Sequence, residues 1–138
     1  MKKKSYVLGI DTAEAETGIG LAGRNIYDIQ TWLSHRNQSQ ELLPKIDRLL
    51  KKHRVMPEQL KWVAANLGPG SFTGLRVGIS LANAFGYGLN IPVVGKKELL
   101  GNTRERVGQL LKLRVKTKSF KQVLPYYGRP PRITHPKK

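Results

Sequence analysis

The chain has 138 residues, enough for one domain with a single hydrophobic core. It contains no cysteine, so it can form no disulfide and offers no thiolate chemistry, which fits a reducing compartment. No apolar run approaches the roughly 20 residues that span a bilayer, and no signal-peptide core follows the lysines at 2–4. We therefore expect a cytoplasmic protein that does not contact the membrane.

The net charge of +16 is the compositional outlier, and its distribution is uneven. From residue 96 onward there are thirteen Lys and Arg against two acids, whereas residues 1–95 hold twelve against seven. Such a basic region attracts polyanions through counterion release, which makes RNA the candidate ligand. The alternatives are a solubilising excess of charge and an acidic protein partner. The candidate RNA contacts are Lys112, Arg114, Lys116 and Lys118.

Three segments rich in β-branched and apolar residues, at 5–10, 17–22 and 25–33, predict an antiparallel meander. A helix is expected over 40–53, where apolar residues recur at helical spacing opposite lysines and arginines. Pro44 in this stretch predicts either a late start near Glu41 or a bend.

Two more strands, at 61–67 and 91–94, should run parallel to the first strand through right-handed crossovers. Between them, a Gly-Pro-Gly-Ser turn leads into a second helix at 73–89, with Ser71 as the expected N-cap. Within that helix, small residues recur every fourth position and mark a tightly packed face. This face should meet either the domain's own sheet or a partner subunit; its residues are Gly74, Gly78 and Ala82.

The last third is less regular. Residues 98–113 predict one more helix, weakened by two glycines, and the alternation at 111–115 predicts a strand or sheet edge with a solvated cationic face. The prolines that follow predict an extended tail. The order of elements indicates an α/β fold with a mixed sheet of about five strands and flanking helices. The prolines are Pro125, Pro130, Pro131 and Pro136.

The segment GPGSFTGLRVG, residues 68–78, closely resembles the signature of the TsaB (YeaZ-type) family. Members of this family assist the transfer of a threonylcarbamoyl group to an adenosine beside the tRNA anticodon. Residues 8–13, 39–46, 90–95 and 127–131 resemble further pieces in family order, and 96–123 shows no correspondence.

The resemblance implies that residues 1–95 form a ribonuclease-H-like half of the actin/sugar-kinase/chaperone-ATPase superfamily. Residues 96–138 would then be a basic, proline-containing segment in place of the family's second subdomain, so a truncated form is expected.

The same resemblance implies a non-catalytic partner of a TsaD-like enzyme in threonylcarbamoyladenosine formation on tRNA. A TsaE-like ATPase is a further implied partner, and either a homodimer or a heterodimer is expected. The chain should have no cofactor of its own, with ATP or ADP binding at the partner interface. That interface is expected on the two helices, at Leu42, Leu43, Ile46, Leu50, Gly74, Arg76, Gly78 and Ala82.

Asp11 ends the first strand in an arrangement similar to the phosphate loop of this superfamily. ATPases of the superfamily carry an Asp-x-Gly-Thr pattern, whereas Ala13 and Glu14 stand here, so ATP hydrolysis by the isolated chain is not expected. The alternative role for Asp11 is to cap its own loop. The candidate nucleotide or phosphate loop comprises Asp11, Thr12, Gly68, Gly70, Ser71 and Thr73.

The opening strands are also similar to those of Holliday-junction-resolvase-like nucleases, which need several carboxylates on metal ions. Here Asp11 can cluster only with Glu14 or Glu16, which disfavours a nuclease. A stand-alone RNA-binding module is the third alternative. The three histidines lack metal-ligand spacing, so the sequence predicts neither a metal site nor the histidine pair of TsaD.

Overall fold

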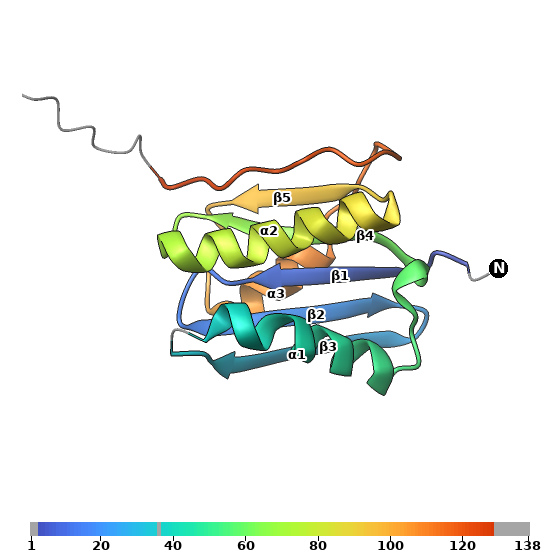
Figure 1. Cartoon of the computed structure of the whole chain (residues 1–138), viewed down its shortest axis with the longest axis horizontal. Helices are drawn as coiled ribbons and strands as arrows, with labels where there is room; N and C mark the ends of the chain where they lie inside the picture. The colour runs from blue at the N-terminus through green and yellow to red at the C-terminus, as the bar shows by residue number, and fades with distance from the viewer. Residues whose placement is uncertain (1–2, 36, 129–138) are drawn as a thin grey trace, which may run out of the picture.

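The computed structural model describes residues 3–35 and 37–128, and it contains one five-stranded mixed sheet in the order β3-β2-β1-β4-β5 (Figure 1). β1, β2 and β3 form the predicted antiparallel meander, and β4 and β5 run parallel to β1. This arrangement confirms the expected ribonuclease-H-like α/β class. The strands are β1 (Tyr6–Asp11), β2 (Glu16–Gly23), β3 (Ile26–Leu33), β4 (Leu60–Gly68) and β5 (Val93–Lys97).

Helices cover both faces of this sheet. α1 (Gln38–Lys52) and α2 (Phe72–Leu89) lie on one face, and α3 (Thr103–Leu111) lies on the other (Figure 1). Because successive side chains of a strand point to opposite faces, β1 supplies both layers. Its Leu8 joins the core under α1 and α2, and its Val7 packs against α3. No helix in the described part of the chain is long and apolar enough to cross a membrane.

α1 begins at Gln38 and contains Pro44, so the predicted late start near Glu41 is wrong. Proline removes one backbone hydrogen bond of the helix. The buried stripe of Leu42, Ile46 and Leu49 continues across the proline, and its burial outweighs that loss. A short 3-10 helix, η1 (Pro57–Gln59), then leads into β4.

α2 begins at Phe72, one residue before the predicted start, and its N-cap is the predicted Ser71. The Ser71 hydroxyl accepts a hydrogen bond from the Gly74 N–H at 3.2 Å and so caps the helix. The small-residue face meets the domain's own loop after β1: a Cβ added at Gly74 or Gly78 would overlap atoms of Thr12. Gly74, Gly78 and Ala82 are all buried within the chain. Of the two packing alternatives, the structure selects the intramolecular one.

α3 is shorter than the predicted helix at 98–113, because a capping box sets its start. The Asn102 side chain accepts from the Glu105 N–H at 2.8 Å, and the Glu105 carboxylate accepts from the Asn102 N–H at 2.9 Å. The helix lies close to the sheet over a floor of glycines. A Cβ added at Gly18 would lie 2.6 Å from Thr103 Cγ2, and one at Gly20 would lie 2.7 Å from Val107 Cγ1.

After α3 the chain is extended and returns to the side of α2 and β5 (Figure 1). Residues 113–118 have no regular secondary structure, so the predicted strand at 111–115 is wrong, although apolar and basic residues do alternate in exposure. The tail is hydrogen-bonded to α2 through the side chain of Asn83. Asn83 of α2 accepts from the Val123 N–H at 3.0 Å and donates to the Val123 carbonyl at 2.9 Å.

The extended conformation predicted for the proline-rich tail is confirmed up to residue 128. Pro130, Pro131 and Pro136 lie outside the described residues, as does most of the family-like piece at 127–131. β5 also differs from the prediction, since it begins at Val93 instead of residue 91. Pro92 precedes it and has no N–H to offer a neighbouring strand.

Candidate functional site

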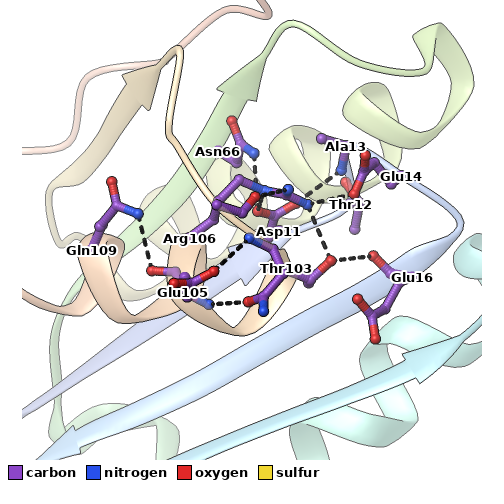
Figure 2. Close-up of polar contacts among 12 residues, drawn as sticks. Asp11, Thr12, Ala13, Glu14, Glu16, Asn66, Thr103, Glu105, Arg106 and Gln109 are labelled. Carbon is purple, nitrogen blue, oxygen red and sulfur yellow. Dashed lines mark hydrogen bonds and ion pairs between the residues drawn. The ribbon is translucent and has the colours of Figure 1, made fainter.

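The carboxyl ends of β1 and β4 meet at one edge of the sheet and place Asp11 beside Asn66 (Figure 2). Asp11 is fully buried. Its Oδ1 accepts a hydrogen bond from the Ala13 N–H at 3.0 Å, as the loop-capping alternative predicted. Its Oδ2 accepts from Asn66 Nδ2 at 2.9 Å and from Arg106 Nε at 2.8 Å. Three donors therefore surround this carboxylate.

Arg106 reaches this edge from α3 (Figure 2), and its guanidinium donates to four acceptors. Besides the bond to Asp11, its Nη2 lies 2.9 Å from Glu14 Oε1 and 3.1 Å from Thr103 Oγ1, and its Nη1 donates to the Gly101 carbonyl at 2.8 Å. Burial opposes the charge on the guanidinium, but the hydrogen bonds and charges of Asp11 and Glu14 outweigh it and raise the pKa of Arg106. Arg106 is therefore a cation throughout the physiological range.

This ion pair decides what Asp11 can do. A metal-dependent nuclease or ATPase needs carboxylate oxygens that are free to bind a metal ion or to orient water. Here Arg106 supplies the positive charge, and it also holds Glu14, the second acid of the cluster that the nuclease alternative required. Among the described residues, no group of three or more acids and histidines is arranged to hold a metal. The geometry is that of a structural ion pair.

The sequence analysis missed Arg106 and Asn66. Arg106 lies 95 positions from Asp11, within a segment that showed no family correspondence. One signal was available: Arg106 stands next to Val107 and four residues before Leu110, on the apolar side of its helix. A cation on the buried side of an amphipathic helix requires a buried acceptor.

The candidate phosphate loop comes together in space, but its side chains point to different places. Asp11 faces α3, whereas the Thr12 hydroxyl donates to the Gly74 carbonyl at 2.5 Å on the α2 side. The Ser71 N–H donates to the Ala13 carbonyl at 2.9 Å. These contacts join the turn after β1 to the start of α2. The Thr12 hydroxyl is used in one of them, and the Ser71 hydroxyl is used in capping α2.

An open cavity of about 530 Å³ remains at the start of α2. Exposed Ser71 and Thr73 line it, together with Gln38 and Glu14. Its described lining contains the Glu14 carboxylate and no lysine or arginine, so it does not fit the phosphates of a nucleotide by itself. The Gln38 side chain is held in the cavity wall because its Nε2 donates to the Glu14 carbonyl at 2.8 Å and to Thr17 Oγ1 at 2.8 Å.

The expected partner interface is largely inside the fold. Of its eight residues, only Leu43 and Arg76 are exposed; the other six pack in the chain's own core. The reason is that the sheet already covers the apolar stripes of α1 and α2. An open groove of about 510 Å³ does run between these helices on their outer side. We call it the α1–α2 groove; it is lined by Ser39, Leu42, Leu43, Arg76, Val77, Ser80, Leu81 and Ala84.

The four candidate RNA contacts lie on the segment that follows α3, away from this groove. Lys112, Arg114, Lys116 and Lys118 are all exposed. Phe72 and Tyr127 stack at 4.0 Å between ring centroids and fasten the far end of the tail to the start of α2.

Residues 32–109 match the family described as TsaD: tRNA N6-adenosine threonylcarbamoyltransferase. TsaB of Buchnera aphidicola subsp. Baizongia pistaciae is 36% identical over 89 residues, which are 64% of this chain and 40% of that protein. TsaB of Bacillus subtilis is 34% identical over 89 residues, 63% of this chain and 38% of that protein. YeaZ from Pseudomonas aeruginosa has a similar structure, with a TM-score of 0.66 and 27% identity over 69% of this chain and 45% of that chain. The chain belongs to the family that residues 32–109 match. These three relatives are TsaB (YeaZ-type) proteins.

The chain spans about two fifths of the length of these curated TsaB relatives. The family match reaches residue 109 and so includes Arg106 and most of α3, where the sequence alone showed no correspondence. The replacement of a second subdomain by residues 96–138 stays a prediction.

Proposed function

We propose that this TsaB-type chain acts in tRNA threonylcarbamoyladenosine biosynthesis as a non-catalytic partner of a TsaD-like enzyme. The names of its TsaB relatives support the pathway. The observation that carries the partner role is the α1–α2 groove, where Leu43 is 50% exposed beside half-buried Val77 and Leu81. Apolar side chains rimmed by a charged residue, here Arg76, are typical of a surface that another protein covers.

The non-catalytic part of the proposal rests on Asp11. Its carboxylate is engaged by Arg106, Asn66 and the Ala13 N–H, so no free acid is available there to activate water. The isolated chain is therefore expected to have neither ATPase nor transferase activity. Turnover by the isolated chain that depends on magnesium and is lost in Asp11→Ala would contradict this.

Further components of the assembly are part of the same proposal. The complex would act on tRNA, and a TsaE-like ATPase would join it. ATP or ADP at the partner interface would need cations from outside the described lining of the cavity at the start of α2, which includes Glu14 and no lysine or arginine. That cavity shares Ser39 and Val77 with the α1–α2 groove, so a partner seated in the groove would also reach the cavity.

The test is co-purification of the chain with a TsaD-like protein. Leu43→Arg combined with Ala84→Arg places two cations in the groove at exposed positions and leaves the core intact. We expect this variant to lose the partner while keeping its unfolding temperature. Leu100→Arg is the matched control, since Leu100 is 78% exposed and lies outside the groove.

Retention of the partner by the groove variant, or equal loss in the control, would reject the groove as the interface. In the remaining outcome, a second copy of the chain occupies the groove. Size-exclusion chromatography of the chain alone tests this by measuring its oligomeric state. A dimer that the double substitution dissociates, with no binding of the TsaD-like protein, would replace the heterodimer with self-association.

A further inference from the structure

A second open cavity, of about 470 Å³, lies at the opposite end of β1 from Asp11. It is formed where β4 begins, β2 ends and the chain leaves α3. We call it the basic cavity. Neither the proposed partner role nor the ion pair of Asp11 uses it. The side chains that matter for its chemistry are Lys61, Trp62, Leu111, Lys112, Leu113 and Arg114.

Three cations meet at this cavity although they come from distant parts of the sequence. Lys61 stands at the start of β4, and Lys112 and Arg114 follow α3. Lys112 and Arg114 are exposed, and none of the described lining residues is acidic. Unlike Arg106, these three side chains make no ion pair with an acid of the described chain. Their charges are therefore available to an anionic ligand.

The walls of the basic cavity are aromatic and apolar. Trp62 is half-buried, and Lys61 Nζ lies 4.9 Å from the centroid of its ring. Leu111 and Leu113 add apolar surface beside it. A polyanion without bases can be bound by positive charge alone. A nucleotide also presents a flat base that packs on an aromatic ring. The combination of cations and an aromatic wall therefore favours nucleic acid over other polyanions.

We propose that the basic cavity binds a single-stranded segment of RNA, with phosphates on Lys61, Lys112 and Arg114 and a base against Trp62. The exposed Lys116 and Lys118 continue the charge along the extended segment and lengthen the track for the backbone. Duplex RNA does not offer an unstacked base to an aromatic ring, so the site should prefer single strands. This site does not depend on the partner role and would stand if the α1–α2 groove proved empty.

The experiment uses Trp62 as a reporter. The chain has two tryptophans, so Trp32→Phe leaves Trp62 as the sole indole. A short single-stranded oligouridylate is titrated into the full chain at several salt concentrations, and tryptophan quenching and fluorescence anisotropy of the labelled RNA are recorded together. We expect quenching that saturates with the anisotropy and an affinity that falls steeply with salt.

The triple variant Lys61→Gln, Lys112→Gln and Arg114→Gln should weaken binding at least tenfold. It should also reduce the slope of log affinity against log salt by about two, since each lost phosphate contact on a single strand contributes about 0.7. The matched control, Arg48→Gln, Lys51→Gln and Arg54→Gln, removes the same charge from exposed positions on and after α1. It should keep most of the affinity and the slope.

Three outcomes would overturn the proposal. Equal loss in the triple variant and its control would show attraction by overall charge. Equal affinity for a blunt-ended RNA duplex without a loop, or for inorganic polyphosphate, which has no bases, would remove the argument for a single strand with bases. Trp62→Leu should weaken binding with an unchanged salt slope; a folded Trp62→Leu chain that binds as tightly as the parent would show that no base contacts the ring.

Discussion

The buried ion pair of Arg106 and Asp11 predicts a large loss of stability when one charge is removed alone. Arg106→Met keeps most of the aliphatic length of the side chain but leaves the Asp11 carboxylate with no cation. Asp11 is fully buried, and Arg106 is 7% exposed. Breaking such a pair at one partner typically costs about 3 to 5 kcal/mol, because the remaining charge is left uncompensated. That is a large share of the roughly 5 to 15 kcal/mol that stabilises an ordinary domain.

A double-mutant cycle separates the ion pair from simple loss of packing. Asp11→Asn with Arg106→Met removes both charges, so the second substitution should cost less in the presence of the first. We expect a coupling free energy in the upper part of the usual range of about 0.5 to 3 kcal/mol. Arg104→Met, at an exposed position on the same helix, is the control and should stay within about 0.5 kcal/mol of the parent.

The free energy of unfolding is measured from urea titrations followed by far-ultraviolet circular dichroism and tryptophan fluorescence. Two results would refute the reasoning. One is an Arg106→Met chain within about 1 kcal/mol of the parent, below the loss expected for a buried pair. The other is a double variant whose loss equals the sum of the single losses within about 0.5 kcal/mol, which is the behaviour of independent sites.

Two further predictions concern packing and pH. Gly78→Ala should lower stability by about 1 to 3 kcal/mol, because the new Cβ overlaps the loop after β1. Gly88→Ala has open space around it and should raise stability by up to about 1 kcal/mol. Thermal unfolding that ranks the two variants the other way would contradict the packing of the small-residue face on that loop. The hydrogen bond from Lys52 lowers the pKa of Asp28 against a smaller effect of desolvation, and His53 adds to the lowering. A depressed folded pKa means that this stabilisation is present above the unfolded value of about 3.9 and is lost as the pH falls through the folded value. Asp28→Asn should therefore destabilise the chain at neutral pH and converge with the parent in acid, and a constant difference across that range would contradict the assignment.

Much of the fold followed from local patterns in the sequence. The meander, the two parallel strands, the cap at Ser71 and the small-residue face of α2 were predicted because alternation, helical spacing and capping depend on near neighbours in the chain. The pairing of Asp11 with its own loop was also among the predicted alternatives, since it spans two residues. The family signature at 68–78 added the family to which the chain belongs.

Only the tertiary structure decided which part of the molecule packs against each of these patterned faces. A stripe of small or apolar residues shows that a face is packed but does not name the neighbour, so Gly78 and Ile46 were placed at a partner interface when the chain's own core covers them. Arg106 reaches Asp11 across 95 positions, and Lys61 joins Lys112 at one cavity, because the sheet brings distant segments together. Periodicity is a property of a single element, whereas a site depends on how several elements pack, and that packing is settled only when the whole core forms.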